Sequence, residues 1–143
     1  MASIRSRIGE FVKDRYLYKA KRKGNEEWIT GSLITCEDGT CKIATSLLEG
    51  KADEPILVCA YDVDRDTICQ CTGLKDKNGK LIWENDIVKI NNSKGNVLIT
   101  FRDFEIICTI PNEKYYKHRL EYDTEYEVVG NIFDNAELLE SEG

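Results

Sequence analysis

The sequence predicts a mainly β protein, a β-rich α+β fold of several short antiparallel strands with an SH3-like barrel portion and short terminal helices. Three observations predict it. Short runs rich in β-branched and aromatic residues succeed one another, turn residues separate them at short intervals, and helical periodicity occurs only near the two ends. Such a pattern favours a barrel or sandwich over a parallel sheet.

The first half of the chain begins with a short helix and continues as strands. The helix is expected within 4–12, where apolar residues recur at i, i+4, i+7 and i+8. Turn and loop residues at 23–26, Gly39, 46–55 and the acidic 62–66 divide the rest of this half into short segments. The strands expected between these turns are 16–21, 28–35, 41–44, 56–61 and 67–72.

The second half begins with a hairpin at Asn78-Gly79. Asn and Gly tolerate positive φ, which a two-residue type I′ turn needs at both centres. A further turn at 84–86 leads into strand 87–90, and the SH3-like portion is expected where strand 97–101 pairs back on it. The remaining strands are expected at 81–83, 105–110 and 125–133, and 111–121 is expected to be irregular or a short helix. Asp134 or Asn135 can cap a final helical turn to Leu139, and Glu137 would complete a capping box from Asp134.

Length and apolar content fit one domain, or two small subdomains sharing a core, with a helical extension at 1–13, a β domain at 14–139 and a frayed tail at 140–143. No apolar run approaches the roughly 20 residues of a membrane span. The first residues show no apolar signal region, so a cytoplasmic location and no membrane partner are expected.

The net charge of −6 is unevenly distributed. Residues 1–23 hold eight Lys/Arg and two Asp/Glu, a local +6, whereas residues 121–143 hold eight Asp/Glu and no Lys/Arg, a local −8. The basic start can contact nucleic acid or an acidic partner, or it can pair with the acidic end of its own chain or of a neighbour.

Signals of enzymatic chemistry are absent from the sequence, so no catalytic residue, cofactor or metal is expected. There is no Gly-rich phosphate loop, no HExxH and no Ser-centred elbow, and His118 is the single histidine. Asp76 and Asp86 can serve acid–base work or hold Mg²⁺, or they can accept backbone N–H bonds in turns, which we prefer. Among the six cysteines, Cys36 and Cys41 are separated by four residues across a hairpin turn, and Cys69 and Cys71 by one residue. The cysteines are interpreted as core residues, with metal binding and redox chemistry as alternatives.

The sequence supports two binding hypotheses. The first is a non-enzymatic protein-binding module that self-associates into a homo-oligomer through its charged termini and strand edges. The second is nucleic-acid binding by the hairpin of Lys75, Lys77 and Lys80, with Trp28 and Trp83 as stacking surfaces.

Three blocks carry a family resemblance. Thr72–Val88 reads TGLKDKNGKLIWENDIV, Glu27–Gly31 reads EWITG, and Tyr126–Asn135 reads YEVVGNIFDN. In this order they resemble the motifs of the YopX-like proteins of phages and prophages, with a match from about 16 to 139. The matching turn and structural residues are Gly31, Thr72, Gly73, Leu74, Asp76, Asn78, Gly79, Asp86, Gly130, Asn131, Asp134 and Asn135.

The resemblance implies a β-rich fold, a bacterial host cell, and a phage or host protein as partner, but no settled activity. Asn85 stands where the family usually has Gly, and we expect positive φ there because Asn tolerates it next best. Ala136 replaces a frequent Pro, and Cys69 and Cys71 replace a Gly and an aromatic residue.

Overall fold

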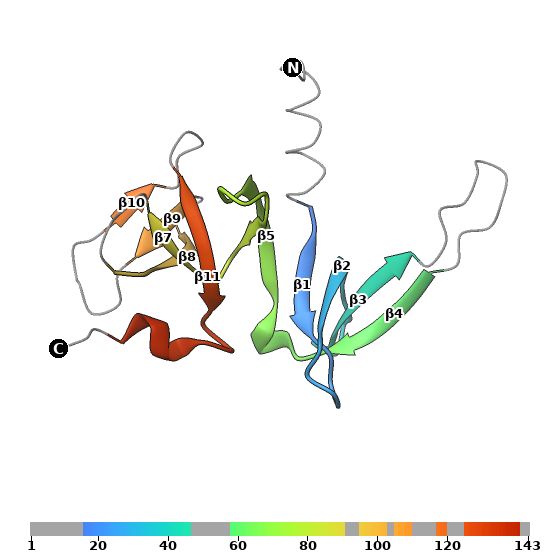
Figure 1. Ribbon diagram of the computed structural model, residues 1–143. Helices are drawn as coiled ribbons and strands as arrows, with labels where there is room; N and C mark the ends of the chain where they lie inside the picture. The colour runs from blue at the N-terminus through green and yellow to red at the C-terminus, as the bar shows by residue number, and fades with distance from the viewer. Residues whose placement is uncertain are drawn as a thin grey trace, which may run out of the picture. The chain divides into compact units, whose positions relative to one another are not determined.

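The computed structural model describes residues 16–46, 58–90, 95–102, 105–109, 117–119 and 125–140. They form two compact units (Figure 1). Residues 16–70 make the N unit, and the described residues from 71 onward make the C unit. Each unit has its own strands and its own cluster of buried side chains, so each is described separately.

The N unit is an antiparallel sheet in the order β4-β3-β2-β1 (Figure 1). Its strands are β1 (Tyr18–Lys21), β2 (Trp28–Thr35), β3 (Cys41–Ser46) and β4 (Val58–Val63), with the 3₁₀ turn η1 (Arg65–Thr67) after them. The first residues of β5 (Cys69–Lys75) pair with β1, Gln70 opposite Tyr18.

Alternation along these strands gives the sheet of the N unit one apolar face and one solvated face. On the apolar face the buried residues are Ala20, Cys41, Ile43 and Val63, with Tyr18, Ile29, Leu33 and Ile68 packed against them. The opposite face has exposed side chains at Thr30, Ser32, Ile34, Ala60 and Asp62. We call this second surface the outer face of the N unit.

The sheet of the N unit curls until its two ends meet at one corner only. There Lys23 donates its N–H to the Asp62 carbonyl at 3.0 Å, and Asp64 donates to the Lys21 carbonyl at 2.9 Å. Along the rest of β4 the described residues supply no second strand, so the sheet stays open.

The C unit contains a hairpin and an antiparallel sheet in the order β10-β9-β8-β7-β11. The hairpin joins the later residues of β5 to β6 (Leu81–Trp83). The sheet strands are β7 (Asp86–Ile90), β8 (Val97–Arg102), β9 (Glu105–Thr109), β10 (Lys117–Arg119) and β11 (Tyr126–Asn131), and the 3₁₀ turn η2 (Ala136–Leu139) comes last. The buried cluster of this unit is Ile82, Val88, Val97, Ile99, Cys108 and Tyr126.

The prediction of a mainly β fold is confirmed, but the prediction of an SH3-like barrel portion is wrong. Among the described strands of the C unit, β10 and β11 stand at opposite ends of an open sheet and do not pair with each other. A barrel needs its two edges to meet. The outer edge of β11 is instead bonded to the hairpin turn at Asp76 and Lys77.

Two local predictions also fail. The Asn78-Gly79 turn is not type I′, because Gly79 (φ +81°) has positive φ whereas Asn78 does not. The predicted capping box does not form either. The N-cap of η2 is Asn135, the other cap residue that the sequence predicts, but without a side-chain cap bond, since its Oδ1 accepts from the Asn131 N–H instead.

Several expectations lie outside the described residues: the helix at 4–12, most of the loop at 46–55, most of 111–121 and the tail beyond 140. Within 111–121, residues 117–119 form the strand β10, so the prediction of irregular structure or a short helix is wrong there. The predicted boundaries at 13/14 and 139/140 stay predictions. No helix among the described residues is long and apolar enough to cross a bilayer.

Candidate interaction surfaces

Asp76 ties the hairpin of the C unit to a strand that lies far along the chain. Its Oδ1 accepts the N–H groups of Asn78 (2.8 Å) and Lys80 (2.9 Å), and its Oδ2 accepts that of Val128 in β11 (3.0 Å). Burial alone would raise the pKa of the Asp76 carboxyl, but these three donors outweigh it and hold that pKa below its ordinary value. Asp76 is only 7% exposed, and it accepts backbone N–H bonds in the turn, as predicted.

The same carboxylate explains the turn type. Two N–H bonds to Asp76 hold the loop in an Asx-type turn, and Gly79 donates to the Asp76 carbonyl at 3.0 Å. The loop therefore has three residues, with Gly79 at the left-handed position that such loops require. Every backbone donor of the tip at Asn78, Gly79 and Lys80 is thus occupied within the hairpin.

Lys77 completes the closure of the β11 edge. Its N–H donates to the Tyr126 carbonyl at 2.9 Å, and its Nζ lies 3.4 Å from a Glu127 oxygen. Tyr126 and Val128 are alternate residues on the same edge, and the hairpin bonds the carbonyl of the first and the N–H of the second. The hairpin turn is therefore a cap on the edge of the C-unit sheet.

The rest of the motif 72–88 is also held by internal hydrogen bonds. Thr72 Oγ1 donates to the Ile82 carbonyl (2.7 Å) and accepts from the Leu74 N–H (3.1 Å), and Gly73 has positive φ (+81°). Asp86, 2% exposed, accepts the Trp83 N–H at 2.8 Å, as predicted for a turn carboxylate.

Asn85 confirms the expected positive φ, with a value of 70°. This conformation directs its backbone to β8 and to the residue that follows β11. Its N–H donates to the Ile99 carbonyl at 2.8 Å, and its carbonyl accepts from Ile132 at 3.0 Å.

The closing motif forms a polar turn around Asn131. Its Oδ1 accepts the N–H groups of Phe133 (3.0 Å) and Asp134 (2.9 Å), and its Nδ2 lies 3.2 Å from an Asp134 oxygen. A Cβ on Gly130 would lie 2.6 Å from Asn135 Oδ1, so only glycine leaves room for that side chain. Gly31 has the same role in the N unit, where a Cβ would lie 2.2 Å from the Ala44 carbonyl oxygen.

The predicted nucleic-acid residues are divided between the two units. Lys75, Lys77 and Lys80 are exposed on the hairpin of the C unit, whereas Trp28 belongs to the N unit. Trp83 is only 7% exposed, so its ring offers no open stacking face. Nothing in the sequence indicates this burial, since a Trp in a three-residue strand can face either way.

Trp28 has neighbours that the sequence analysis did not identify. Lys19 Nζ lies 4.7 Å from its ring centroid and Lys21 Nζ lies 5.5 Å from it. Both distances are typical of cation–π contacts. The alternation of lysines in β1 is the available signal, but by itself it indicates only the polar side of a strand.

The outer edge of β4 differs from that of β11. The Asp62 carbonyl accepts from the Lys23 N–H, so the backbone N–H and C=O of Asp62 point away from β3. By alternation, the backbone N–H and C=O of Ala60 also point away from β3. We call the outward backbone groups of Val58, Ala60 and Asp62 the β4 edge. Within the described part of the chain, no backbone group bonds to Ala60 from that side, and its side chain is exposed.

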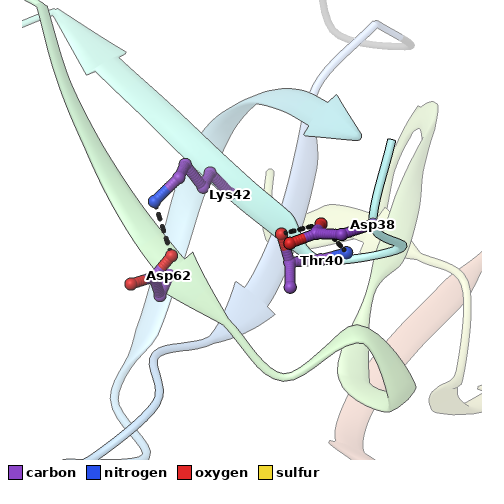
Figure 2. A network of polar contacts seen from close by, with 4 residues as sticks. All are labelled: Asp38, Thr40, Lys42 and Asp62. Carbon is purple, nitrogen blue, oxygen red and sulfur yellow. Dashed lines mark hydrogen bonds and ion pairs between the residues drawn. The ribbon is translucent and has the colours of Figure 1, made fainter. Parts of the chain in front are cut away.

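Close to this edge lies a small polar network on the outer face of the N unit (Figure 2). Lys42 Nζ lies 2.6 Å from Asp62 Oδ1, which raises the pKa of the Lys42 ammonium and lowers that of the Asp62 carboxyl. In the turn before β3, the hydroxyl and N–H of Thr40 donate to Asp38 Oδ1 and lower the pKa of that carboxyl. Both contacts are exposed, so they orient side chains more than they stabilise the fold.

The described residues contain no group of three His, Cys, Asp or Glu side chains placed to hold a metal. All six cysteines are free thiols, and four of them, Cys41, Cys69, Cys71 and Cys108, are buried as the core interpretation predicts. Burial raises the pKa of the Cys108 thiol to about 12, which keeps it protonated and unreactive. Cys36 and Cys59 are half-buried.

Comparison with known proteins gives a family and a fold. The model of the YopX protein family matches residues 17–140, whereas no curated protein matches. Among solved structures, the chain is similar to the crystal structure of protein EF1440 from Enterococcus faecalis, at 24% identity over 86% of this chain and 96% of that one, with a TM-score of 0.53. Because the family match spans nearly all of the sequence, the chain belongs to the YopX protein family.

Proposed function

We propose that this chain is a non-enzymatic accessory protein of a phage or prophage that binds other proteins, in the first place a second copy of itself, through the β4 edge. It would act in the cytoplasm of the bacterial host cell. The observation that carries the proposal is the outward-facing backbone of Ala60, which has no partner among the described residues.

The chemistry of the β4 edge supports addition of a strand. Its pairing with β3 keeps one continuous register from Val58 to Val63, so no bulge bends it away. It contains no proline, and its only charged side chain is Asp62, at the corner where Lys23 already binds. Natural proteins blunt edges with bulges, charges and proline, and an edge without these devices pairs readily with another strand.

Substitution of Ala60 tests the proposal directly. Ala60→Pro removes one outward N–H but leaves the ladder to β3 intact, because the Ala60 amide does not face β3. Ala60→Thr is the matched control, since it keeps the N–H and suits a strand. Light scattering after size exclusion should show an oligomer for the parent chain and for Ala60→Thr, and a smaller species for Ala60→Pro.

Salt separates this interface from pairing of the charged termini. Association through backbone hydrogen bonds should be nearly independent of salt, whereas an oligomer held by the basic start and the acidic end should loosen as salt rises. A monomer at every concentration and salt level would overturn the proposal, and so would Ala60→Pro assembling like the parent chain while its circular dichroism is unchanged.

The alternative is nucleic-acid binding by the 75–80 hairpin. Exposed Lys75 and Lys80 support it. Against it, Lys77 is paired with Glu127 and the backbone donors of the tip are bonded within the hairpin. We therefore rank it below protein binding.

A further inference from the structure

We propose that two copies of the chain join β4 to β4 in one antiparallel register, with the two-fold axis of the dimer passing between the two copies of Cys59. This inference rests on the proposed function, because it specifies which strand pairs with the β4 edge and in what alignment. It gives the outward backbone groups of Val58 and Ala60 a bonding partner and places a half-buried thiol at the centre of the interface.

Two-fold symmetry limits the possible registers. At a two-fold interface, a residue that contacts a second residue of the partner is contacted in return by its own copy of that pair. In an antiparallel ladder, residues directly opposite each other share a face of the sheet and a hydrogen-bonding type, and both properties alternate along each strand. The axis therefore passes between a residue and its own copy. The described open part of β4 offers three such places, Val58, Cys59 and Ala60.

The corner of the N unit excludes an axis at Ala60. In that register the partner's Val58 would lie directly opposite Asp62. The backbone of Lys23 already occupies this position, since its N–H donates to the Asp62 carbonyl at 3.0 Å. Backbone cannot turn aside as a side chain can, so an axis at Ala60 would require the corner of the sheet to open.

An axis at Cys59 bonds the outward groups of the edge without disturbing the corner. Ala60 then lies opposite the partner's Val58, and both residues direct their backbone N–H and C=O away from β3. Such a pair exchanges both of its N–H···O bonds, and the symmetry makes the pair twice. An axis at Val58 would make only one such pair from the described residues, and the backbone of Ala60 would gain no described partner.

The same register joins the apolar faces of the two sheets. Cys59 lies opposite Thr45 and Tyr61 lies opposite Ile43, which belongs to the buried cluster of the N unit, so Cys59 is on the apolar face. A two-fold axis perpendicular to the sheet keeps both apolar faces on the same side. None of the three paired positions has a charged side chain, so the dimer brings no like charges together there.

The axis brings the two Cys59 thiols within reach of each other. Because Cys59 directs its backbone groups toward β3, its pair across the axis is of the non-hydrogen-bonded type, with Cα atoms about 4.5 Å apart. Disulfides span Cα separations of about 4.4–6.8 Å. Oxidised glutathione can therefore link the two copies: one Cys59 thiolate forms a mixed disulfide and releases one glutathione, and the partner's Cys59 thiolate then displaces the second.

Thiol trapping tests the register. The paired segment is short, so the dimer should depend on concentration, and a covalent link records it even when it is weak. The full chain is incubated with oxidised glutathione over a range of concentrations, and non-reducing gel electrophoresis detects the covalent dimer. The tryptic peptide 52–65 has Cys59 as its only cysteine, and mass spectrometry should find this peptide linked to its own copy.

Variants of the thiols locate the axis. Cys59→Ser should abolish the covalent dimer, whereas Cys36→Ser, which removes the other half-buried thiol, should leave it unchanged. Cys59→Ser with Ala60→Cys moves the thiol by one residue. In the proposed register the two displaced thiols belong to diagonal neighbours, about 7–8 Å apart at Cα, so trapping should fall roughly ten-fold or more. An axis at Ala60 would instead make this variant the one that is trapped.

The outcomes separate the register from the proposed function. An oligomer that Ala60→Pro dissociates, but in which Cys59 does not link to its own copy, would overturn the register and leave strand pairing at the β4 edge in place. A monomer in light scattering at every concentration would overturn both. A link that forms at the same rate in Ala60→Pro, with unchanged circular dichroism, would mean that the thiols meet by chance, and it would also overturn the register.

Discussion

The two units treat their sheet edges differently. In the C unit, the outer edge of β11 is covered by a turn, with Val128 bonded to the Asp76 carboxylate and Tyr126 to the Lys77 amide. In the N unit, the described backbone bonds of the β4 edge lie only at its corner, to Lys23. Since unprotected edges invite pairing, an edge that is capped in one unit and open in the other indicates where association is prevented and where it is available.

The cap is expected to be the most sensitive point of the molecule. Asp76→Ala removes three hydrogen bonds to a charged group and leaves their N–H donors unpaired, which should lower the free energy of unfolding by about 3 kcal/mol or more. Urea denaturation measures it. Loss of the cap should also expose the β11 edge, so the variant should associate more than the parent chain in light scattering.

Asp38→Ala is the matched control for that change. Asp38 also accepts the N–H of a turn residue, but its hydrogen bonds among the described residues go to Thr40 and are exposed. Its removal should shift the urea midpoint very little. Equal shifts for the two variants would contradict the idea that the link to Val128 gives Asp76 its importance.

The N unit should be most sensitive at Gly31. A methyl group there would meet the Ala44 carbonyl oxygen at 2.2 Å, and backbone cannot turn aside as a side chain can. Gly31→Ala should therefore destabilise the sheet by about 1–3 kcal/mol through overpacking, measured by thermal unfolding. Ser32→Ala, one residue further along the strand, is the control and should have nearly no effect, because Ser32 is exposed.

Crowding at Gly130 involves a side chain rather than the backbone, so it is easier to relieve than crowding at Gly31. Its Cβ would meet the Asn135 side chain at 2.6 Å, and that side chain can be shortened. Gly130→Ala should destabilise the C unit, and adding Asn135→Ala should recover part of the loss. The double-mutant cycle should give a coupling of about 0.5–3 kcal/mol, whereas strict additivity would show that the two positions do not interact.

Local chemistry was predictable from the sequence, and distant contacts were not. Positive φ at Asn85 and the acceptor role of Asp76 depend on residue type and on neighbours in the chain. That Asp76 also reaches Val128, 52 residues later, has no local signal, and this second bond joins the turn to a strand edge. The prediction of a type I′ turn was wrong for a related reason, since the rule for Asn-Gly does not consider the carboxylate of Asp76, two residues before Asn78.

The candidate surfaces also depend on distant contacts that the sequence does not reveal. Trp28 and Trp83 look equivalent in the sequence, but one lies under two lysine ammonium groups and the other is buried. Which side of a strand faces the core depends on register, and register is fixed by partners far along the chain. The β4 edge could not be predicted either, because strand order decides which strand is last.

The acid dependence of the cap is the smallest effect and the most specific. The pKa of the Asp76 carboxyl is lower in the folded chain than its ordinary value of 3.8, so the ionised form binds the N–H donors best. Its contribution is therefore fully present above about pH 4 and is lost as pH falls through the folded pKa. The stability difference between the parent chain and Asp76→Asn should be constant from about pH 7 to pH 5 and should shrink at about pH 3. Urea midpoints at these values measure it, and a difference that stays constant in acid would mean that the cap depends on the shape of the side chain rather than on its charge.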